Sequence, residues 1–135
     1  MRAPKTREIS IALRSGALAA VVPLMVRILP LPRVLSMLQP KGRLRESSLN
    51  ANELARIAGA AVRFGPRFGV GECLVRSLVL YNLLRRSAYN PVLLIGGRLC
   101  EGQLDCHCWI EVDGKSLCEL NDPREIFKLL YRFEA

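Results

Sequence analysis

The stretch Gly71-Glu-Cys-Leu-Val-Arg-Ser-Leu-Val-Leu-Tyr-Asn-Leu-Leu-Arg-Arg86 predicts a helix from about Cys73 to Arg86 that is apolar on most sides. A helix of this kind is usually buried at the centre of a domain. Cys73 stands at its predicted N-terminus, where the helix dipole and free amide groups stabilise a thiolate and lower the pKa of a thiol. The same amides can hold a developing oxyanion. By itself, this position also suits a structural cysteine.

The elements on either side of this helix predict an α+β fold. Upstream, Asn50 and Glu53 form a capping-box pattern that opens a helix, and Gly65-Pro66 ends it. Downstream, the pattern predicts three strands, at residues 91–95, 106–112 and 115–120, with Gly96-Gly97 near the end of the first. A closing helix is predicted at residues 123–133. Helices followed by a small antiparallel sheet are typical of the α+β class.

The charge distribution divides the chain of 135 residues near position 45. Residues 1–45 contain nine Lys and Arg residues against one acid, whereas the remaining 90 residues contain eleven of each sign. The net charge of +8 therefore lies in the first third. A basic body that wraps nucleic acid is disfavoured. We expect a basic amphipathic helical segment at 1–45 and a catalytic domain at 46–135, and we expect deletion of about residues 1–40 to leave the catalytic residues able to assemble.

Residues 8–38 predict one or two amphipathic helices, broken near Pro30–Pro32. The longest apolar run, residues 16–26, is shorter than the roughly 20 residues of a membrane span. The residues before it and after it do not fit a secretory signal. Packing on the core, peripheral contact with a membrane surface and docking of a partner all remain open for this segment.

The five cysteines predict a cytoplasmic protein with reduced thiols, because their number is odd and no export signal precedes them. Four of them lie between positions 100 and 118, so a zinc site has to be considered. Cys106 and Cys108, however, flank His107 within a predicted strand, where neighbouring side chains point to opposite faces. We therefore favour small buried side chains over zinc and expect no metal and no cofactor.

His107 is the single histidine and the natural general base for a cysteine nucleophile. In the strand around it, Cys106, Cys108 and Ile110 form an apolar face, and His107 points to the other face with Trp109. A structural, hydrogen-bonded histidine is the alternative.

The hairpin register decides which acid faces His107. A three-residue turn, Val112–Gly114, pairs Glu111 with Lys115 and brings Glu119 opposite His107. A carboxylate in that position orients the imidazole. We prefer this register because it pairs opposite charges.

A two-residue turn at Asp113-Gly114 gives the alternative register. It places Leu120 opposite His107 and turns Glu119 to the other face. In that case Asp122 becomes the expected partner of the imidazole.

These residues resemble one known family, the transglutaminase-like leader peptidases of lasso-peptide biosynthesis. The resemblance runs over about residues 46–122 and rests on four ordered segments: Gly71-Glu-Cys-Leu-Val-Arg-Ser-Leu78, Leu83-Leu-Arg-Arg86, Pro91-Val-Leu-Leu-Ile-Gly96 and His107-Cys-Trp-Ile-Glu-Val-Asp-Gly114. It implies a papain/transglutaminase-like cysteine protease core, in which a central helix carries the nucleophile and packs on a small antiparallel sheet, preceded by N-terminal helices. The basic start also resembles the helical lead-in of stand-alone members of the family.

The resemblance implies that the protein removes the leader from a ribosomally made precursor peptide. Cys73 maps to the family's nucleophile and His107 to its base, while Glu119 stands where the family has aspartate. The implied partners are the precursor, a separate small leader-recognition protein and an ATP-dependent macrolactam cyclase. A transglutaminase or amidase using the same residues, and a non-catalytic module that binds an acidic peptide or membrane surface through the basic segment, are the alternatives.

Overall fold

The computed structural model describes residues 6–40, 49–66, 70–117, 119 and 121–134. Nine elements follow one another along these residues: α1 (Thr6–Ile28), α2 (Leu31–Leu38), α3 (Ala51–Phe64), α4 (Glu72–Arg86), β1 (Val92–Cys100), β2 (Gln103–Val112), β3 (Lys115–Ser116), α5 (Pro123–Ile126) and β4 (Lys128–Glu134). The predicted α+β class, with helices first and a small antiparallel sheet after them, is confirmed.

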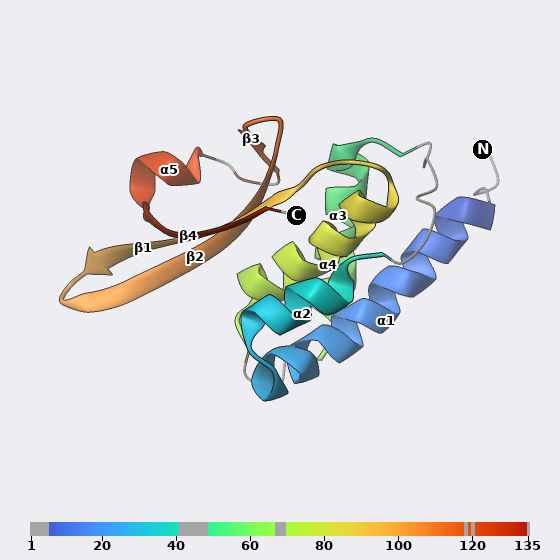
Figure 1. Ribbon diagram of the computed structural model, residues 1–135, viewed down its shortest axis with the longest axis horizontal. Helices are drawn as coiled ribbons and strands as arrows, with labels where there is room; N and C mark the ends of the chain where they lie inside the picture. Colours follow the sequence, from blue (N-terminus) through green and yellow to red (C-terminus); the bar gives the residue numbers. More distant parts are fainter. Residues whose placement is uncertain (1–5, 41–48, 67–69, 118, 120, 135) are drawn as a thin grey trace.

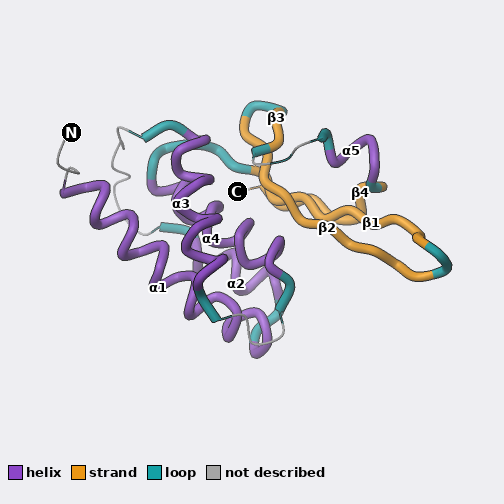
Figure 2. Tube along the Cα trace, turned by 180° about the vertical axis from the view of Figure 1, so that it is seen from behind, coloured by secondary structure: helices purple, strands orange, loops and turns teal. Residues whose placement is uncertain are grey.

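The four long helices pack together at one end of the molecule, and the sheet extends away from them (Figure 1). Helix α4 contacts α1, α2 and α3 as well as strands β1 and β2, so it is the central helix that its apolar composition predicts. The sheet is antiparallel with the order β3-β2-β1-β4. Seen from behind, the β1–β2 hairpin projects well beyond the helical layer (Figure 2).

The helix boundaries follow the capping signals in the sequence. The Asn50 side chain accepts a hydrogen bond of 2.8 Å from the backbone N–H of Glu53 and donates one of 2.8 Å to its carboxylate. Asn50 is thus the N-cap that the sequence predicts, with Glu53 bound to its side-chain amide, and α3 ends at Phe64 before Gly65. The N-terminal segment breaks between α1 and α2, with Pro30 directly before α2.

Helices α1 and α2 belong to the same hydrophobic core as α3 and α4. Their contribution consists of side chains that are at most 3% exposed: Ala19, Val22, Val34, Leu35 and Leu38. The Leu38 carbonyl also accepts a hydrogen bond of 2.7 Å from the buried Asn82 side chain of α4. The basic segment is thus distinguished by its charge, while its buried side chains pack with those of the rest of the chain.

Helix α1 is longer and more apolar than the uninterrupted run at residues 16–26 suggests. By length and composition its residues Ile9–Ile28, with a mean hydropathy of 1.9, are sufficient to cross a membrane, so the expectation that this segment is too short is wrong. Core helices of soluble proteins and N-terminal signal sequences meet the same criterion. The length and hydropathy of α1 therefore do not determine where in the cell the protein is located.

Strand β1 continues through the two glycines that were expected near its end. Gly96 and Gly97 pair with His107 and Cys106 of β2 in the middle of the sheet. A Cβ atom at Gly96 would lie 2.7 Å from the Cβ of Phe127 and 3.0 Å from the Trp109 ring. Glycine is required here because aromatic side chains cross the strand at this point.

The hairpin between β2 and β3 has the register that the sequence analysis did not prefer. Val112 pairs with Lys115 across a two-residue turn, so the predicted pairing of Glu111 with Lys115 is wrong. Asp113 and Gly114 have φ angles of 51° and 78°. Two residues with positive φ form the turn whose twist matches that of the paired strands, and this matters more than one exposed charge pair.

Strand β3 ends at Ser116, although the sequence predicts a strand as far as Leu120. The Leu117 N–H still donates to the Ile110 carbonyl, at 3.0 Å. The predicted opposition of Leu120 to His107 lies outside the described residues, as does Cys118. Beyond Leu117 the pairing register therefore does not determine where the Glu119 side chain lies.

The closing helix predicted at residues 123–133 is wrong. A single helical turn, α5, is followed by β4, which pairs with β1 along the edge of the sheet. The alternation of Leu129, Tyr131 and Phe133 has the period of a strand, and Phe133 packs against the core beside Tyr81, with ring centroids 6.0 Å apart. The open edge of β1 thus provides the backbone partners that make this segment a strand.

We predict that the N-terminal helices are needed for folding, the opposite of the deletion result expected from composition. Leu35→Ala is expected to lower the free energy of unfolding by about 2–5 kcal/mol, because Leu35 is fully buried. Leu13→Ala, at a position 71% exposed, is expected to change it by less than about 0.5 kcal/mol. Denaturant unfolding followed by circular dichroism measures both. Cooperative unfolding of the chain lacking residues 1–40 would contradict the prediction.

Candidate active site

Cys73 is the second residue of α4 and is partly exposed. The helix begins after Gly71, which has no side chain to cap the first amide groups. The positive end of the helix dipole and the backbone N–H groups of the first turn therefore lie beside the Cys73 thiol. This is the position that the sequence predicts for a reactive cysteine.

The surroundings of Cys73 hold the pKa of its thiol at about 5, well below the ordinary value of 9.0. A hydrogen bond from the Cys108 thiol makes the largest contribution, and burial opposes it. The Cys108 backbone and the charge of His107 lower the pKa further. The neighbouring thiolate and burial raise the pKa of Cys108, so Cys108 keeps its proton and donates it to the sulfur of Cys73. At neutral pH the sulfur of Cys73 is a thiolate.

His107 lies between this thiolate and a carboxylate. Its Nε2 atom is 2.8 Å from Oε1 of Glu119. Because Nε2 bonds to the carboxylate, Nδ1 is the ring nitrogen left for the Cys73 side. The structure therefore brings together all three residues that the sequence analysis proposed, Cys73, His107 and Glu119.

The Glu119 carboxylate has a second partner on the helix that carries Cys73. The Arg76 guanidinium lies 3.6 Å from Oε1, and both side chains are largely shielded from solvent, with 25% and 13% exposed. Arg76 follows Cys73 by three residues and so lies on the same side of α4. The ion pair ties the loop that carries Glu119 to the helix that carries the thiolate.

Two aromatic rings flank the imidazole. Phe127 stacks on His107 with a centroid separation of 5.2 Å, and the Trp109 ring lies 6.0 Å away. His107 and Trp109 share one face of β2, as the alternation predicts. Although this is the face opposite the apolar one, it is not open to solvent, because Trp109 is only 1% exposed. The rings hold the imidazole in position and exclude water from one side of it.

Asp122, the alternative acid, does not contact His107. Its carboxylate caps α5 and accepts a hydrogen bond of 3.0 Å from the Arg124 backbone. Arg124 in turn binds Glu111 through two hydrogen bonds of 2.8 and 3.0 Å, and the Trp109 indole donates to the same carboxylate at 2.9 Å. Asp122 thus caps α5 and Glu111 holds α5 against the sheet, so the two-residue turn does not make Asp122 the partner of His107.

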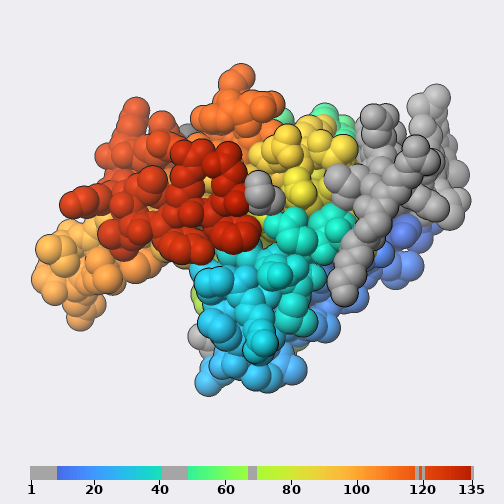
Figure 3. All heavy atoms as spheres, in the orientation of Figure 1, coloured from blue at the N-terminus to red at the C-terminus, as the bar shows by residue number. Residues whose placement is uncertain are grey.

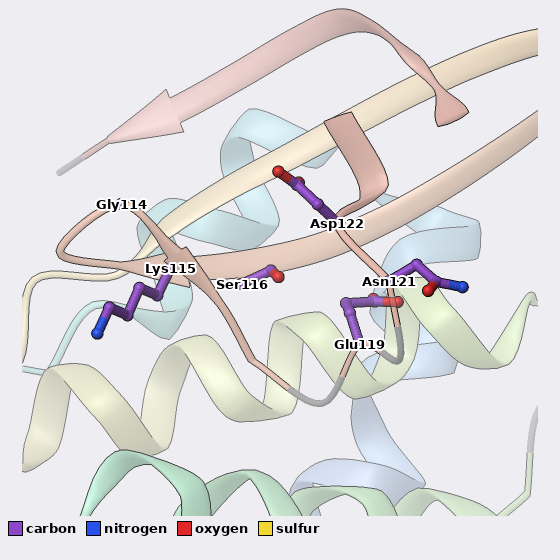
Figure 4. A pocket seen from close by; sticks show the side chains of 6 residues that line it. All are labelled: Gly114, Lys115, Ser116, Glu119, Asn121 and Asp122. Carbon is purple, nitrogen blue, oxygen red and sulfur yellow. The ribbon is translucent and has the colours of Figure 1, made fainter. Parts of the chain in front are cut away.

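Glu119 also borders a polar depression of 290 Å³ along the loop after β3 (Figure 4). Its lining consists of Gly114, Lys115, Ser116, Glu119, Asn121 and Asp122. Neither Cys73 nor His107 contributes to it. We therefore do not assign this depression as the place where a reacting bond binds.

One comparison identifies the family. The sequence pattern of the transglutaminase-like superfamily matches residues 17–132. The chain belongs to the transglutaminase-like superfamily. Members of this superfamily typically have cysteine protease or transglutaminase activity. The match includes the second half of α1, all of α2 and the sheet, in agreement with the core that these elements share. No match was found among curated proteins or among solved structures.

Three residues of this superfamily domain contribute to the site but were not singled out from the sequence. The sequence could have pointed to Arg76, because it follows Cys73 by three residues on the same helix. It could not have pointed to Phe127, because that residue was predicted to lie in the closing helix. Cys108 was interpreted as a small apolar residue; it is buried, at 7% exposed, but it also lowers the pKa of the Cys73 thiol. Cys106, expected on the same buried face, is exposed.

We predict that Cys73 is alkylated fastest among the cysteines and that its rate has a midpoint near pH 5. The rate follows the thiolate fraction, which falls as the pH drops through the pKa. Removing the Cys108 thiol by Cys108→Ala should raise the midpoint by at least about one unit. Iodoacetamide labelling with peptide mass mapping measures it. Cys106→Ala is the matched control, and an unchanged midpoint in Cys108→Ala would contradict the role of that thiol.

Proposed function

We propose that the protein is a cysteine endopeptidase that removes the leader from a ribosomally synthesised precursor peptide, as in lasso-peptide maturation. The observation that carries the peptidase proposal is the 2.8 Å hydrogen bond between Glu119 and His107, next to a Cys73 thiol of lowered pKa. The resemblance of the segments around Cys73 and His107 to lasso-peptide leader peptidases supports the substrate.

In the proposed reaction the Cys73 thiolate attacks the carbonyl carbon at the junction of leader and core. The backbone N–H groups at the start of α4 are placed to stabilise the oxyanion. Imidazolium at His107 gives its proton to the leaving amine, and a thioester remains on the sulfur. Neutral imidazole then takes a proton from water, the hydroxide attacks the thioester, and the thiolate leaves.

Glu119 keeps the imidazole in the useful orientation and stabilises its charged form. It replaces the aspartate of the resembling family and is longer by one methylene. Its ion pair with Arg76 at 3.6 Å holds the longer side chain toward His107. The proposed partners are the precursor, a separate leader-recognition protein and the ATP-dependent cyclase. A cytoplasmic location fits a reaction that needs a reduced thiolate.

The test combines the purified protein with the precursor peptide encoded near its gene, with and without the leader-recognition protein encoded there. Mass spectrometry should find leader and core fragments whose masses add up to the precursor plus one water. Intact precursor under both conditions would overturn the proposed function. Addition of monodansylcadaverine distinguishes a transglutaminase, since the same thioester would then yield an amine adduct in place of the hydrolysed fragment.

A further inference from the structure

The edge of β2 that faces β3 is paired only near its end, at Ile110–Val112, and the rest of that edge leads away from the active site without a partner strand among the described residues. In an antiparallel sheet the N–H and C=O groups of one residue point to the same edge and alternate along the strand. The Ile110 carbonyl bonds to Leu117 on the β3 side, so Leu104 and Cys106 direct their backbone groups to that side as well. Among the described residues, no backbone hydrogen bond joins the Leu104–Cys106 edge to another segment.

The sheet face next to this edge is apolar and uncovered. Leu99, Leu104 and Leu130 are 79%, 64% and 56% exposed. Leu104 and Leu130 lie together over Gly97, where a Cβ atom would be 3.3 and 2.8 Å from them. Further along, the same face carries Leu93 and Ile110 and is buried against the helices. Figure 3 shows the hairpin extending past the helical body, and the front and back views of Figures 1 and 2 show that helices α1 to α4 do not reach this part of the sheet.

The open edge and the exposed apolar face both continue along β2 toward the active site. His107 follows Cys106 directly on this strand, and α4, which carries Cys73 at its start, packs against β2. A peptide that paired with Leu104 and Cys106 would therefore run toward the thiolate, with a side chain beside Leu104 on the apolar face.

We propose that the open edge of β2 binds the substrate as an added strand, and that the substrate class is an extended peptide with apolar side chains on alternate residues beside the scissile bond. Backbone pairing provides the affinity, and Leu104, on β2 itself, selects the apolar side chains. This inference rests on the proposed peptidase function. The continuity of the edge with Cys73 favours substrate over a second copy of the chain.

The experiment measures binding without turnover, in the Cys73→Ala protein. The probe is a fluorescein-labelled peptide of alternating valine and threonine with terminal lysines, followed by fluorescence anisotropy. We expect N-methylation of alternate residues in the probe to raise its Kd about tenfold, because it removes backbone donors. Leu104→Glu should raise the Kd by a similar factor. Phe64→Glu, at a residue of α3 that is 87% exposed, is the matched control and should change nothing.

Several results would overturn the inference: no binding of the probe, equal affinities for the probe and its methylated form, or no effect of Leu104→Glu in a folded protein. A dimer that Leu104→Glu dissociates would assign the edge to a second copy instead. Failure of the proposed function is a separate result. In that case the probe binds as expected, but the unmodified protein leaves the precursor intact.

Discussion

Cys73→Ala is expected to lower the turnover of the precursor by about 10⁶-fold, the scale on which loss of a covalent nucleophile acts in other proteases. The substitution removes the sulfur that forms the thioester, and none of the other described cysteines is placed to replace it. Cys108 is buried and keeps its proton, because its pKa is raised. Single-turnover assays with mass detection measure the residual rate.

The matched control is Cys100→Ala, which removes an exposed thiol at the end of β1. It should leave the rate unchanged, and both variants should unfold at the same denaturant concentration as the unmodified protein. Retention of more than about one hundredth of the activity in Cys73→Ala would remove this residue from the reaction.

Glu119→Gln is expected to lower kcat by up to about 10⁴-fold while the fold persists. The amide cannot stabilise the imidazolium at His107, and it removes the ion pair with Arg76. Glu119→Asp should retain appreciable activity, because a carboxylate remains within reach. Rates at saturating substrate separate this loss from weakened binding.

Asp122→Asn is the control for the acid assignment. Asp122 caps α5 and does not touch the imidazole, so we expect its loss to leave the rate within a few-fold of the original. A rate that collapses in Asp122→Asn and is nearly unchanged in Glu119→Gln would exchange the roles of the two acids.

Local signals in the sequence were sufficient for helices α3 and α4 and for the placement of Cys73 and His107 within their elements. The capping box at Asn50 and the apolar stretch after Gly71 located α3 and α4 to within about a residue. The helix start identified Cys73, and the alternation around His107 placed its ring on the face of Trp109. These features depend on interactions between residues close together in the chain, and the pattern of neighbouring residues is sufficient to predict such interactions.

The position of Glu119 was predicted correctly from an incorrect register. The three-residue turn was preferred for a charge pair, but the left-handed backbone of Asp113 and Gly114 makes the turn one residue shorter. The chain then leaves the sheet after Ser116, and the loop carries Glu119 to His107 independently of strand pairing. A short-range rule could not reveal this, because the loop is positioned by contacts with α4.

The sequence by itself determined the α+β class, the central helix, the cysteine at its start and the histidine on the strand. Only the tertiary structure decided that α1 and α2 complete the core, that residues 128–134 form a strand, and that Cys108 and Arg76 adjust the site. The physical reason is the range of the interactions. Caps and periodicity act within a few residues, whereas burial, strand pairing and ion pairs join residues brought together by the fold.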